Sequence, residues 1–506
     1  MKKHKLMKKL FAKKTLYDLT EESNHHHFKR VLGPFSLTAM GVGAVIGAGI
    51  FVLTGLAARE FAGPALILSF VLSGLACIFV ALCYAEFASM VPLAGSAYTY
   101  SYAALGEIFA WIIGWDLILE YSLASSLVAV GWSHYFVNLI GTFGLHIPVW
   151  LTNDYWTLLH HSNGALTHVA PYFYGIPIVM NLPAALIIVV ITALLVVGIK
   201  ESARFNSIIV GVKLTVILLV IFIGWFYVKK ENWGNSFSTF APFGVGGIGT
   251  GAAYVFFAYI GFDAVSTTAQ EARNPKRDVP IGIIASLVLC TILYIAVTAI
   301  LTGMIYYKEI NVDAPLADAF ARYGMVKVSF FISVGAVAGL TSVLLVLLLS
   351  QSRIFWAIAR DGLLPERIFA AVHPRFGTPY LSTIIVGGCV AITAGCLPIE
   401  EIAKLVNIGT LLAFCLVSVA VIILRIKDPH HPRAFRCPFV PVIPILGIIA
   451  CVYMMIRLEL FTWIRLFVWL AIGGIIYVTY GRRHSKLAKK HALMAKEKES
   501  PACLPL

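Results

Sequence analysis

Long apolar stretches recur along this chain of 506 residues, and they restrict its fold more than any other feature. Five of them contain no acidic or basic residue: Phe35 to Ala58, Phe61 to Ala85, Val279 to Tyr307, Phe376 to Ile399 and Leu405 to Leu424. A bilayer core about 30 Å thick needs about 20 apolar residues per helix. Only 13% of the residues are charged, against roughly 25% in a soluble domain. The chain is therefore expected to cross a membrane many times.

Together with several lightly charged runs, these stretches predict an all-α polytopic membrane protein with roughly twelve spans. The largest stretch between spans, roughly Gly141 to Asn181, is polar and aromatic and too short for a catalytic domain, so function is expected within the membrane. We place the spans at 35–58, 62–90, 108–139, 182–199, 205–228, 246–269, 279–304, 328–358, 380–397, 402–424, 438–457 and 460–480.

Lysine and arginine are concentrated on one side of these spans. The two tails and four alternate loops hold 29 of the 39 basic residues. Because cytoplasmic loops are enriched in lysine and arginine, both termini are predicted to be cytoplasmic, with the chain in the cell membrane. The same distribution accounts for the net charge of +14, so no nucleic-acid partner is expected.

Two spans are predicted to be broken. The first contains GVGAVIGAGIF, from Gly41 to Phe51, in which four glycines weaken the helix by about 1 kcal/mol each relative to alanine. The sixth contains GGIGTGAAYVFFAYIGFD, from Gly246 to Asp263, and both interruptions fall near mid-membrane. Such a pair at the start of two successive five-helix units points to an inverted-repeat transporter with a central site. The alternative is that the glycines only allow close helix packing.

This interpretation divides the chain into two repeats, two extra helices and two tails. The predicted segments are a basic tail at 1–34, a first repeat at 35–228, a second inverted repeat at 229–424, helices 11 and 12 at 425–480, and a tail at 481–506.

Several motifs resemble those of the amino acid, polyamine and organocation transporter superfamily, most closely the bacterial members of its cationic amino acid transporter subfamily. The resemblance implies a five-plus-five inverted repeat with two extra helices, amino acid transport, and coupling to protons rather than sodium. It rests on GVGAVIGAGIFVLTG from Gly41, CYAEFASMVPLAGSAYTYSYAALGE from Cys83, GWDLILEY from Gly114, SARFN from Ser202, FFAYIGFDAVSTTAQEARNPKRDVPIGI from Phe256 and RDGLLP from Arg360.

The first break is expected to hold the carboxylate of an amino acid. Freed backbone N–H groups at the positive end of a half-helix bind anions, and Gly47, Ala48 and Gly49 supply them here. Val45 and Ile46 would present carbonyls and side chains nearby. The substrate site of the resembling family falls on these positions.

The sixth break is expected to hold the ammonium group of the same substrate. The carbonyls of Phe257, Ala258 and Ile260 are placed to accept hydrogen bonds from it. Phe262 is interpreted as a gate over the substrate, although aromatic residues in a span often serve packing alone.

Glu120 and Leu347 are the candidates for contact with the substrate side chain. Glu120 lies about 20 Å along the third span and resembles the acidic residue with which the family meets a basic side chain. Asp116 is one turn earlier on the same face. Either acid can instead pair with a neighbouring helix. Leu347 belongs to a bulky apolar wall in the eighth span, which favours small neutral amino acids.

Lys213 is the candidate for proton coupling, because it is the only lysine inside a predicted span. Its ammonium group is expected to bridge the first break and the hydroxyls of Thr341 and Ser342, where sodium-coupled relatives of this fold bind their cation. Loss of the proton would release that clamp. The alternatives are a lysine that reaches the cytoplasmic interface, a permanent structural ion pair, and hydroxyls that serve only packing.

The sequence thus predicts a secondary active transporter of L-amino acids, small neutral or cationic, working as a proton symporter by alternating access. An exchanger, a channel or an amino acid sensor would use the same pocket. An enzyme is not expected, because the chain contains no HExxH, GxSxG or CxxC motif and no Walker-type lysine loop. No cofactor and no metal are expected; the partners are the substrate, the proton and the lipid bilayer.

Overall fold

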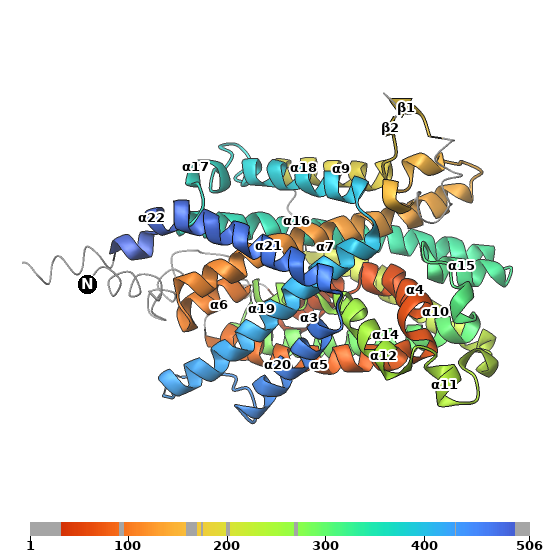
Figure 1. Ribbon diagram of the computed structural model, residues 1–506, viewed down its shortest axis with the longest axis horizontal. Coiled ribbons are helices and arrows are strands. Elements are labelled where there is room, and N and C mark those ends of the chain that lie inside the picture. Colours follow the sequence, from red (N-terminus) through yellow and green to blue (C-terminus); the bar gives the residue numbers. More distant parts are fainter. Residues whose placement is uncertain are drawn as a thin grey trace, which may run out of the picture.

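The computed structural model describes residues 32–90, 96–157, 170–173, 176–198, 203–267, 272–430 and 432–490. This part of the chain is nearly all helical, and the long helices run along the longest axis of the molecule (Figure 1). Eight helical segments are long and apolar enough to cross a membrane, and four shorter apolar helices accompany them. The predicted fold class is confirmed. The tails fall mostly outside the described residues.

Ten helices in the described part of the chain are unbroken and 15 to 35 residues long. They are α5 (Leu66–Met90), α7 (Glu107–Gly141), α9 (Leu182–Val197), α10 (Ala203–Gly224), α14 (Pro275–Met304), α16 (Val326–Arg360), α18 (Tyr380–Cys396), α19 (Ile399–Lys427), α20 (Val442–Ile456) and α21 (Leu460–Ile476).

The first and sixth spans are each built from shorter pieces. The first comprises α3 (Pro34–Val45), the π-helical turn η1 (Gly49–Leu53) and α4 (Thr54–Ala57); the sixth comprises α12 (Gly244–Val255), the 3₁₀ turn η8 (Phe256–Tyr259) and α13 (Ala264–Thr267). The predicted breaks are therefore present.

Short elements cover the two ends of the bundle. They are α6 (Ser96–Ala104), α11 (Phe237–Phe240), α15 (Pro315–Arg322), α17 (Glu366–Phe369), α22 (Arg482–His484), strands β1 (Tyr172–Phe173) and β2 (Ile176–Pro177), and the single turns η2 (Ala58–Ala62), η3 (Gly63–Ala65), η4 (Val149–Leu151), η6 (Trp225–Tyr227), η7 (Lys230–Trp233), η10 (Tyr307–Glu309) and η11 (Tyr477–Gly481).

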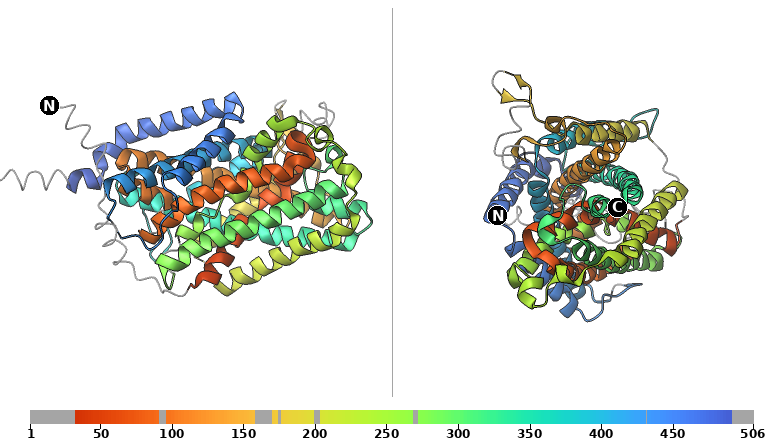
Figure 2. Two further views of the ribbon diagram at one scale, coloured as in Figure 1. Left: turned by 90° about the horizontal axis from the view of Figure 1, so that it is seen from below. Right: turned by 90° about the vertical axis from the view of Figure 1, so that its right-hand side faces the viewer.

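Burial separates central helices from peripheral ones. In α7, 83% of an apolar 18-residue stretch is buried inside the protein. In the segment Leu460–Lys490, which contains α21, the corresponding share is 22%. α7 packs against α16, α19, α18 and α9 at once, and the end-on view in Figure 2 shows the long helices gathered side by side into one bundle. An apolar face that no helix covers suits a lipid boundary. The deep interior of α7 is thus the place where buried polar side chains need an explanation.

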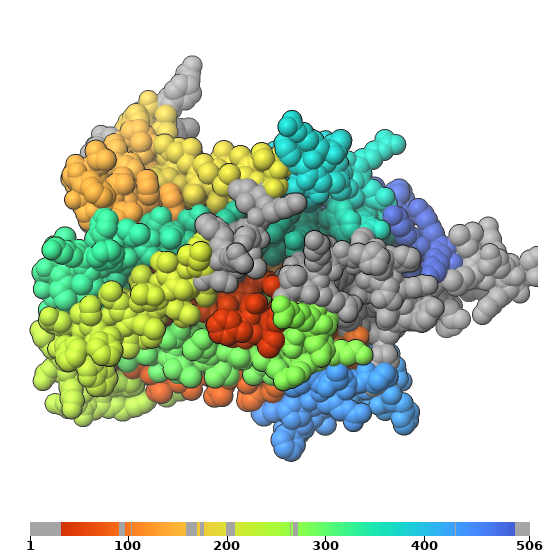
Figure 3. Space-filling model, turned by 180° about the vertical axis from the view of Figure 1, so that it is seen from behind, coloured from red at the N-terminus to blue at the C-terminus, as the bar shows by residue number. Residues whose placement is uncertain are grey.

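The first span lies against two helices from distant parts of the sequence. α3 packs on both α10 and α14, and in Figure 3 its red surface is visible between the yellow-green α10 and the green α14. These contacts bring Lys213 of α10 and Tyr294 of α14 to the end of α3.

Charged clusters are found near both ends of α19. Near its end, Arg425 donates two hydrogen bonds of 2.8 Å to the carboxylate of Glu86, and Arg433 Nε lies 3.0 Å from the same group. Near its start, Lys404 Nζ lies 3.0 Å from each of Glu400, Glu401 and Glu459. Arg425 follows Lys404 by 21 positions, which correspond to about 31 Å of helix. The buried basic and acidic side chains near the two ends of α19 therefore form ion pairs.

Candidate functional site

The first break is a short stretch of non-helical backbone. α3 ends at Val45, and Ile46 adopts an extended conformation with ψ 99°. The helical path resumes through Ala48 and η1, so the N–H groups at its start lack a carbonyl one turn earlier within the same segment. All five predicted residues of this break, Val45 to Gly49, are buried.

The sixth break is longer. α12 ends at Val255, η8 tightens the chain through Tyr259, and Ile260 is extended with ψ 136°. Gly261 follows with φ +111°, a conformation that favours glycine. Phe257 O accepts a hydrogen bond of 3.1 Å from Ile260 N, so one lone pair of this predicted substrate ligand is already used.

The two breaks are in direct contact. A Cβ atom added to Gly49 would lie 2.3 Å from Ala258 Cα, and one added to Gly261 would lie 3.0 Å from Ala44 O. Close approach of the backbones therefore requires both glycines. The predicted sensitivity of Gly49 to substitution has a second physical reason, because any side chain there would push the breaks apart before it reached a substrate. Gly47 is different: its added Cβ would meet only the side chain of Val343, at 3.3 Å.

Tyr294 of α14 joins the breaks and was not predicted. Its hydroxyl oxygen lies 2.8 Å from Val45 O and 2.8 Å from Ala258 O. One hydroxyl proton is shared between two carbonyls, so movement of either break changes the bond to the other. The available signal was a tyrosine in the charge-free stretch from Val279 to Tyr307, because a buried tyrosine hydroxyl needs a partner.

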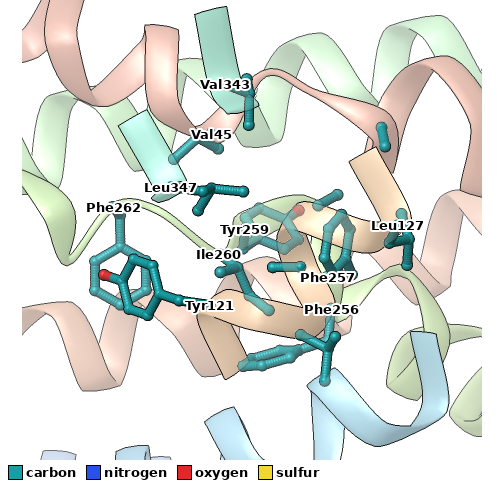
Figure 4. Packing of buried hydrophobic residues seen from close by; sticks show 14 of the residues in the cluster. Val45, Tyr121, Leu127, Phe256, Phe257, Tyr259, Ile260, Phe262, Val343 and Leu347 are labelled. Atoms are coloured by element: carbon teal, nitrogen blue, oxygen red, sulfur yellow. The ribbon is translucent and has the colours of Figure 1, made fainter. Parts of the chain in front are cut away.

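Apolar side chains surround the contact between the breaks. Figure 4 shows Val45, Phe257, Ile260 and Leu347 turned toward one common region, with Val343 and Leu127 at its edge. Phe262 packs against Tyr84 and Phe414, with ring centroids 5.7 and 5.2 Å apart, and Tyr121 lies beside it in Figure 4. The chemistry of this region suits an uncharged side chain.

Glu120 and Asp116 lie on α7 and are buried. Within the described residues, both carboxylate oxygens of Asp116 and Oε2 of Glu120 have no hydrogen-bond partner. The following residue, Tyr121, donates a 3.2 Å hydrogen bond to Asp263, which comes directly after Phe262. Glu120 is thus the neighbour in sequence of Tyr121, which contacts the sixth break through Asp263.

Lys213 reaches the first break from α10. Its Nζ donates hydrogen bonds of 2.7 Å to Gly43 O and 3.2 Å to Ile46 O, and the residue is fully buried. Its methylene groups pack on Gly339 of α16, where an added Cβ would lie 3.0 Å from Lys213 Cε. The ammonium group therefore satisfies carbonyls that the end of α3 leaves without helical partners.

The hydroxyls of Thr341 and Ser342 make bonds within α16. Thr341 donates to Val337 O at 2.7 Å and accepts from Trp132 Nε1 at 2.9 Å, while Ser342 donates to Gly339 O at 3.2 Å. Their positions on α16 place them two and three residues after Gly339, on which Lys213 packs. A role in coupling for these hydroxyls stays a prediction.

A cavity of about 830 Å³ leads toward the first break from the end of the bundle that holds Lys404. Val52 and Val130 line its deep part, and Asp154, Asp313 and Glu400 line its polar part. Gly131, next to Val130, lies against Val52 and Ala48: its added Cβ would be 2.9 Å from Val52 Cγ2 and 3.5 Å from Ala48 Cβ. Val52, which lines the cavity, thus lies four residues after Ala48 of the first break.

Comparison with known proteins covers most of the chain. A family model described as amino acid permease matches residues 32–481. A methylthioribose transporter of Bacillus subtilis (strain 168) is 48% identical over 483 residues, covering 96% of this chain and all of that protein. A branched-chain amino acid permease of the same strain is 50% identical over 480 residues, with 94% and 99% covered. The vacuolar cationic amino acid transporter 4 of Arabidopsis thaliana is 32% identical over 585 residues, with 93% and 94% covered.

Proposed function

Because this chain belongs to the amino acid permease family, we propose that it carries neutral L-amino acids across the cell membrane together with protons. Family membership makes it a multi-pass membrane transporter and not an enzyme. Secondary active symport, alternating access and cytoplasmic termini are parts of the proposal, as is the division into inverted repeats at 35–228 and 229–424.

The observation that carries the proposal is the contact between the two breaks. N–H groups from Gly47 to Gly49 and carbonyls from Phe257 to Ile260 lie on adjoining backbone segments, as the close approach of Gly49 to Ala258 requires. A zwitterionic head group needs donors and acceptors side by side, and half-helix ends supply the donors with a favourable dipole. A site built from backbone recognises the feature that all amino acids share.

The side-chain region supports a neutral substrate. Phe257, Ile260, Leu347 and Val343 present only carbon to it (Figure 4), so a charged substrate group would lose its hydration there without compensation. Apolar side chains from alanine to leucine gain contacts instead. Among the similar proteins, one is named a branched-chain amino acid permease, which agrees with this substrate class.

Counterflow in proteoliposomes tests the proposal. Vesicles loaded with unlabelled alanine should accumulate labelled alanine, and excess external leucine or valine should compete better than arginine or lysine. Stronger competition by the cationic amino acids would overturn the substrate class. Binding of amino acids without counterflow would identify a sensor.

Two glycine variants make the test specific to the first break. Gly47→Ala places a methyl group 3.3 Å from Val343 Cγ2, a close contact with a side chain and not with backbone. The methyl group also narrows access to the backbone N–H groups, so affinity for alanine should fall about tenfold, or about 1.4 kcal/mol. Gly388→Ala is the matched control, because no atom lies within 4 Å of its added Cβ. Equal affinities of the two variants would remove the first break from the site.

A further inference from the structure

We propose that Asp116, together with Glu120, forms a proton-binding site between α7 and α19 that is separate from Lys213. The ligand is a proton held by a carboxyl group and released during each transport cycle. The existence of this site is independent of the proposed substrate; its part in the cycle rests on the proposed proton symport.

The first observation is that Asp116 is buried and has no partner. Its exposed fraction is 0%, and Oδ1 and Oδ2 have no hydrogen-bond partner in the part of the chain that the structure describes. Glu120, one helical turn later, is 2% exposed and its Oε2 is also without a partner. Among the described residues, no lysine, arginine or histidine forms an ion pair with either carboxyl group.

The second observation is that α19 is shaped around Asp116. A Cβ atom added to Gly409 would lie 2.6 Å from Asp116 Oδ1 and 3.4 Å from Oδ2. The carboxyl group therefore lies close to the backbone of α19 at Gly409, and any side chain at position 409 would force it to move. On the same helix, the Thr410 hydroxyl is within hydrogen-bonding reach of Glu120.

The titratable groups around the pair are acidic or phenolic. Asp263 of the sixth break and Tyr84 of α5 lie close enough to Glu120 to interact with it electrostatically, as does Tyr121 of α7. α6 contributes Tyr100, which is near Asp263; α16 contributes the neutral Gln351, and α21 contributes Trp469, stacked on Trp115. The nearest lysine along α19, Lys404, is held by three glutamates.

Electrostatics then requires a proton. An ionised aspartate in the bilayer interior costs about 2.5 to 3.5 kcal/mol even on permissive scales. Like charges four residues apart on a helix repel each other, and two adjacent carboxyl groups lower this cost by sharing one proton. A proton on the pair is consistent with the close contact between Asp116 of α7 and Gly409 of α19.

Release of the proton would change the contact between the helices. An anionic Asp116 pressed against Gly409 has no donor, so the interface must admit water or separate. Binding of the proton thus favours the closed contact between α7 and α19, and its release favours an opened one. The site would link proton occupancy to the movement of α19, whereas the role proposed for Lys213 would link it to the first break.

Infrared difference spectroscopy of the purified full-length protein tests the site without any substrate. The wild type at neutral pH should show the carbonyl stretch of a protonated carboxylic acid, and Asp116→Asn should shift or remove that band, because the proton can then be held only by Glu120. Asp278→Asn is the matched control, because the buried Asp278 side chain already accepts a 3.1 Å hydrogen bond from Asn274 N; the band of the α7 pair should be the same in this variant as in the wild type. If the spectrum of Asp116→Asn is the same as that of the wild type, the proposed site is overturned. If Asp116→Asn does not fold, Glu120→Gln takes its place. A carboxylic acid band at the same frequency in Glu120→Gln as in the wild type would overturn the proposal that the two carboxyl groups share a proton.

Transport assays test release of the proton. Asparagine resembles a permanently protonated aspartate, so Asp116→Asn should retain alanine counterflow, which needs no net proton movement, and lose at least about tenfold in accumulation driven by a pH gradient. Undiminished accumulation would show that the proton is static and overturn its role in the cycle. Wild-type counterflow without any proton-driven accumulation would overturn the proposed symport and the role of the site in it, while the infrared test would still decide whether the site exists.

Discussion

Buried charges at the ends of the bundle and those at its centre are satisfied in different ways. At one end, the carboxylate of Glu86 accepts three hydrogen bonds of 2.8 Å, two from Arg425 and one from Cys437 N. At the centre, Asp116 is at least as deeply buried and has no hydrogen-bond partner among the described residues. A group whose partners are all fixed holds helices together, while a group without fixed partners is available for a ligand that comes and goes.

The lysines repeat this contrast. Lys404 is surrounded by three carboxylates, whereas the hydrogen bonds of 2.7 and 3.2 Å from Lys213 go to backbone carbonyls at the first break. Backbone carbonyls carry only partial charge, so they hold an ammonium group less firmly than carboxylates do. Lys213 is therefore better suited than Lys404 to change its protonation state during transport.

The largest effect is expected from removal of the central lysine. Lys213→Ala should abolish accumulation driven by an inward proton gradient, because the carbonyls of Gly43 and Ile46 lose their donor. Uptake into proteoliposomes with an imposed pH gradient measures this, with sodium absent and then present. Undiminished accumulation, or dependence of the wild type on sodium, would contradict the assignment.

Lys404→Ala is the comparison for that experiment. It should lower thermal stability, because Glu400, Glu401 and Glu459 are left without their shared cation, yet the folded protein should still accumulate alanine. If both Lys213→Ala and Lys404→Ala lose proton-driven accumulation, the proposed difference between lysines at the centre and at the end of the bundle is contradicted.

The next largest effect concerns Glu86. Glu86→Ala removes the buried carboxylate that contacts both Arg425 and Arg433, and removing one partner of a buried ion pair costs about 3 to 5 kcal/mol. The loss of stability is measured by denaturing the purified protein and monitoring how it ceases to be monodisperse. Glu366→Ala is the control, because its pair with Lys486 is about half exposed and is expected to contribute at most about 1 kcal/mol. Similar losses in the two variants would contradict the structural role of Glu86.

A smaller effect is expected at Glu120. Glu120→Gln should weaken any binding of arginine or lysine about tenfold, or about 1.4 kcal/mol, because a charge-assisted partner is replaced by a neutral one. Alanine has no side-chain charge and should lose less. Competition assays with alanine and arginine give both affinities. Equal losses would make Glu120 a structural residue with no part in selectivity.

The smallest effect is expected on the stability of Asp116→Asn. Asparagine has nearly the same shape as a protonated aspartate, so the free energy of unfolding should change by less than about 0.5 kcal/mol. Glu86→Gln, in contrast, removes a charge that two arginines need and should melt clearly earlier. A strong destabilisation by Asp116→Asn would mean that Asp116 is ionised and held by a partner, as Glu86 is.

Much of the fold followed from local properties of the sequence. The runs without charge located the spans, and the glycines from Gly41 to Gly49 located the first break, because hydropathy and helix propensity act over neighbouring residues. Lys213 and Glu120 were selected because a charge inside an apolar run is costly wherever the run is placed. These arguments need no knowledge of which helices are neighbours.

Only the tertiary structure decided which groups meet. Tyr294 lies 249 residues after Val45 and 36 after Ala258, yet its hydroxyl is within hydrogen-bond distance of both carbonyls. Asp116 lies against Gly409 of another helix, and Glu86 binds two arginines that come more than 300 residues later in the sequence. The physical reason is that hydrogen bonds and close contacts extend over a few ångströms in space, while their partners are set by the packing of whole helices. The sequence by itself determined where the long apolar helices lie and where two of them break; the packing decided which buried ionisable groups have fixed partners and which, like Asp116, have none among the described residues.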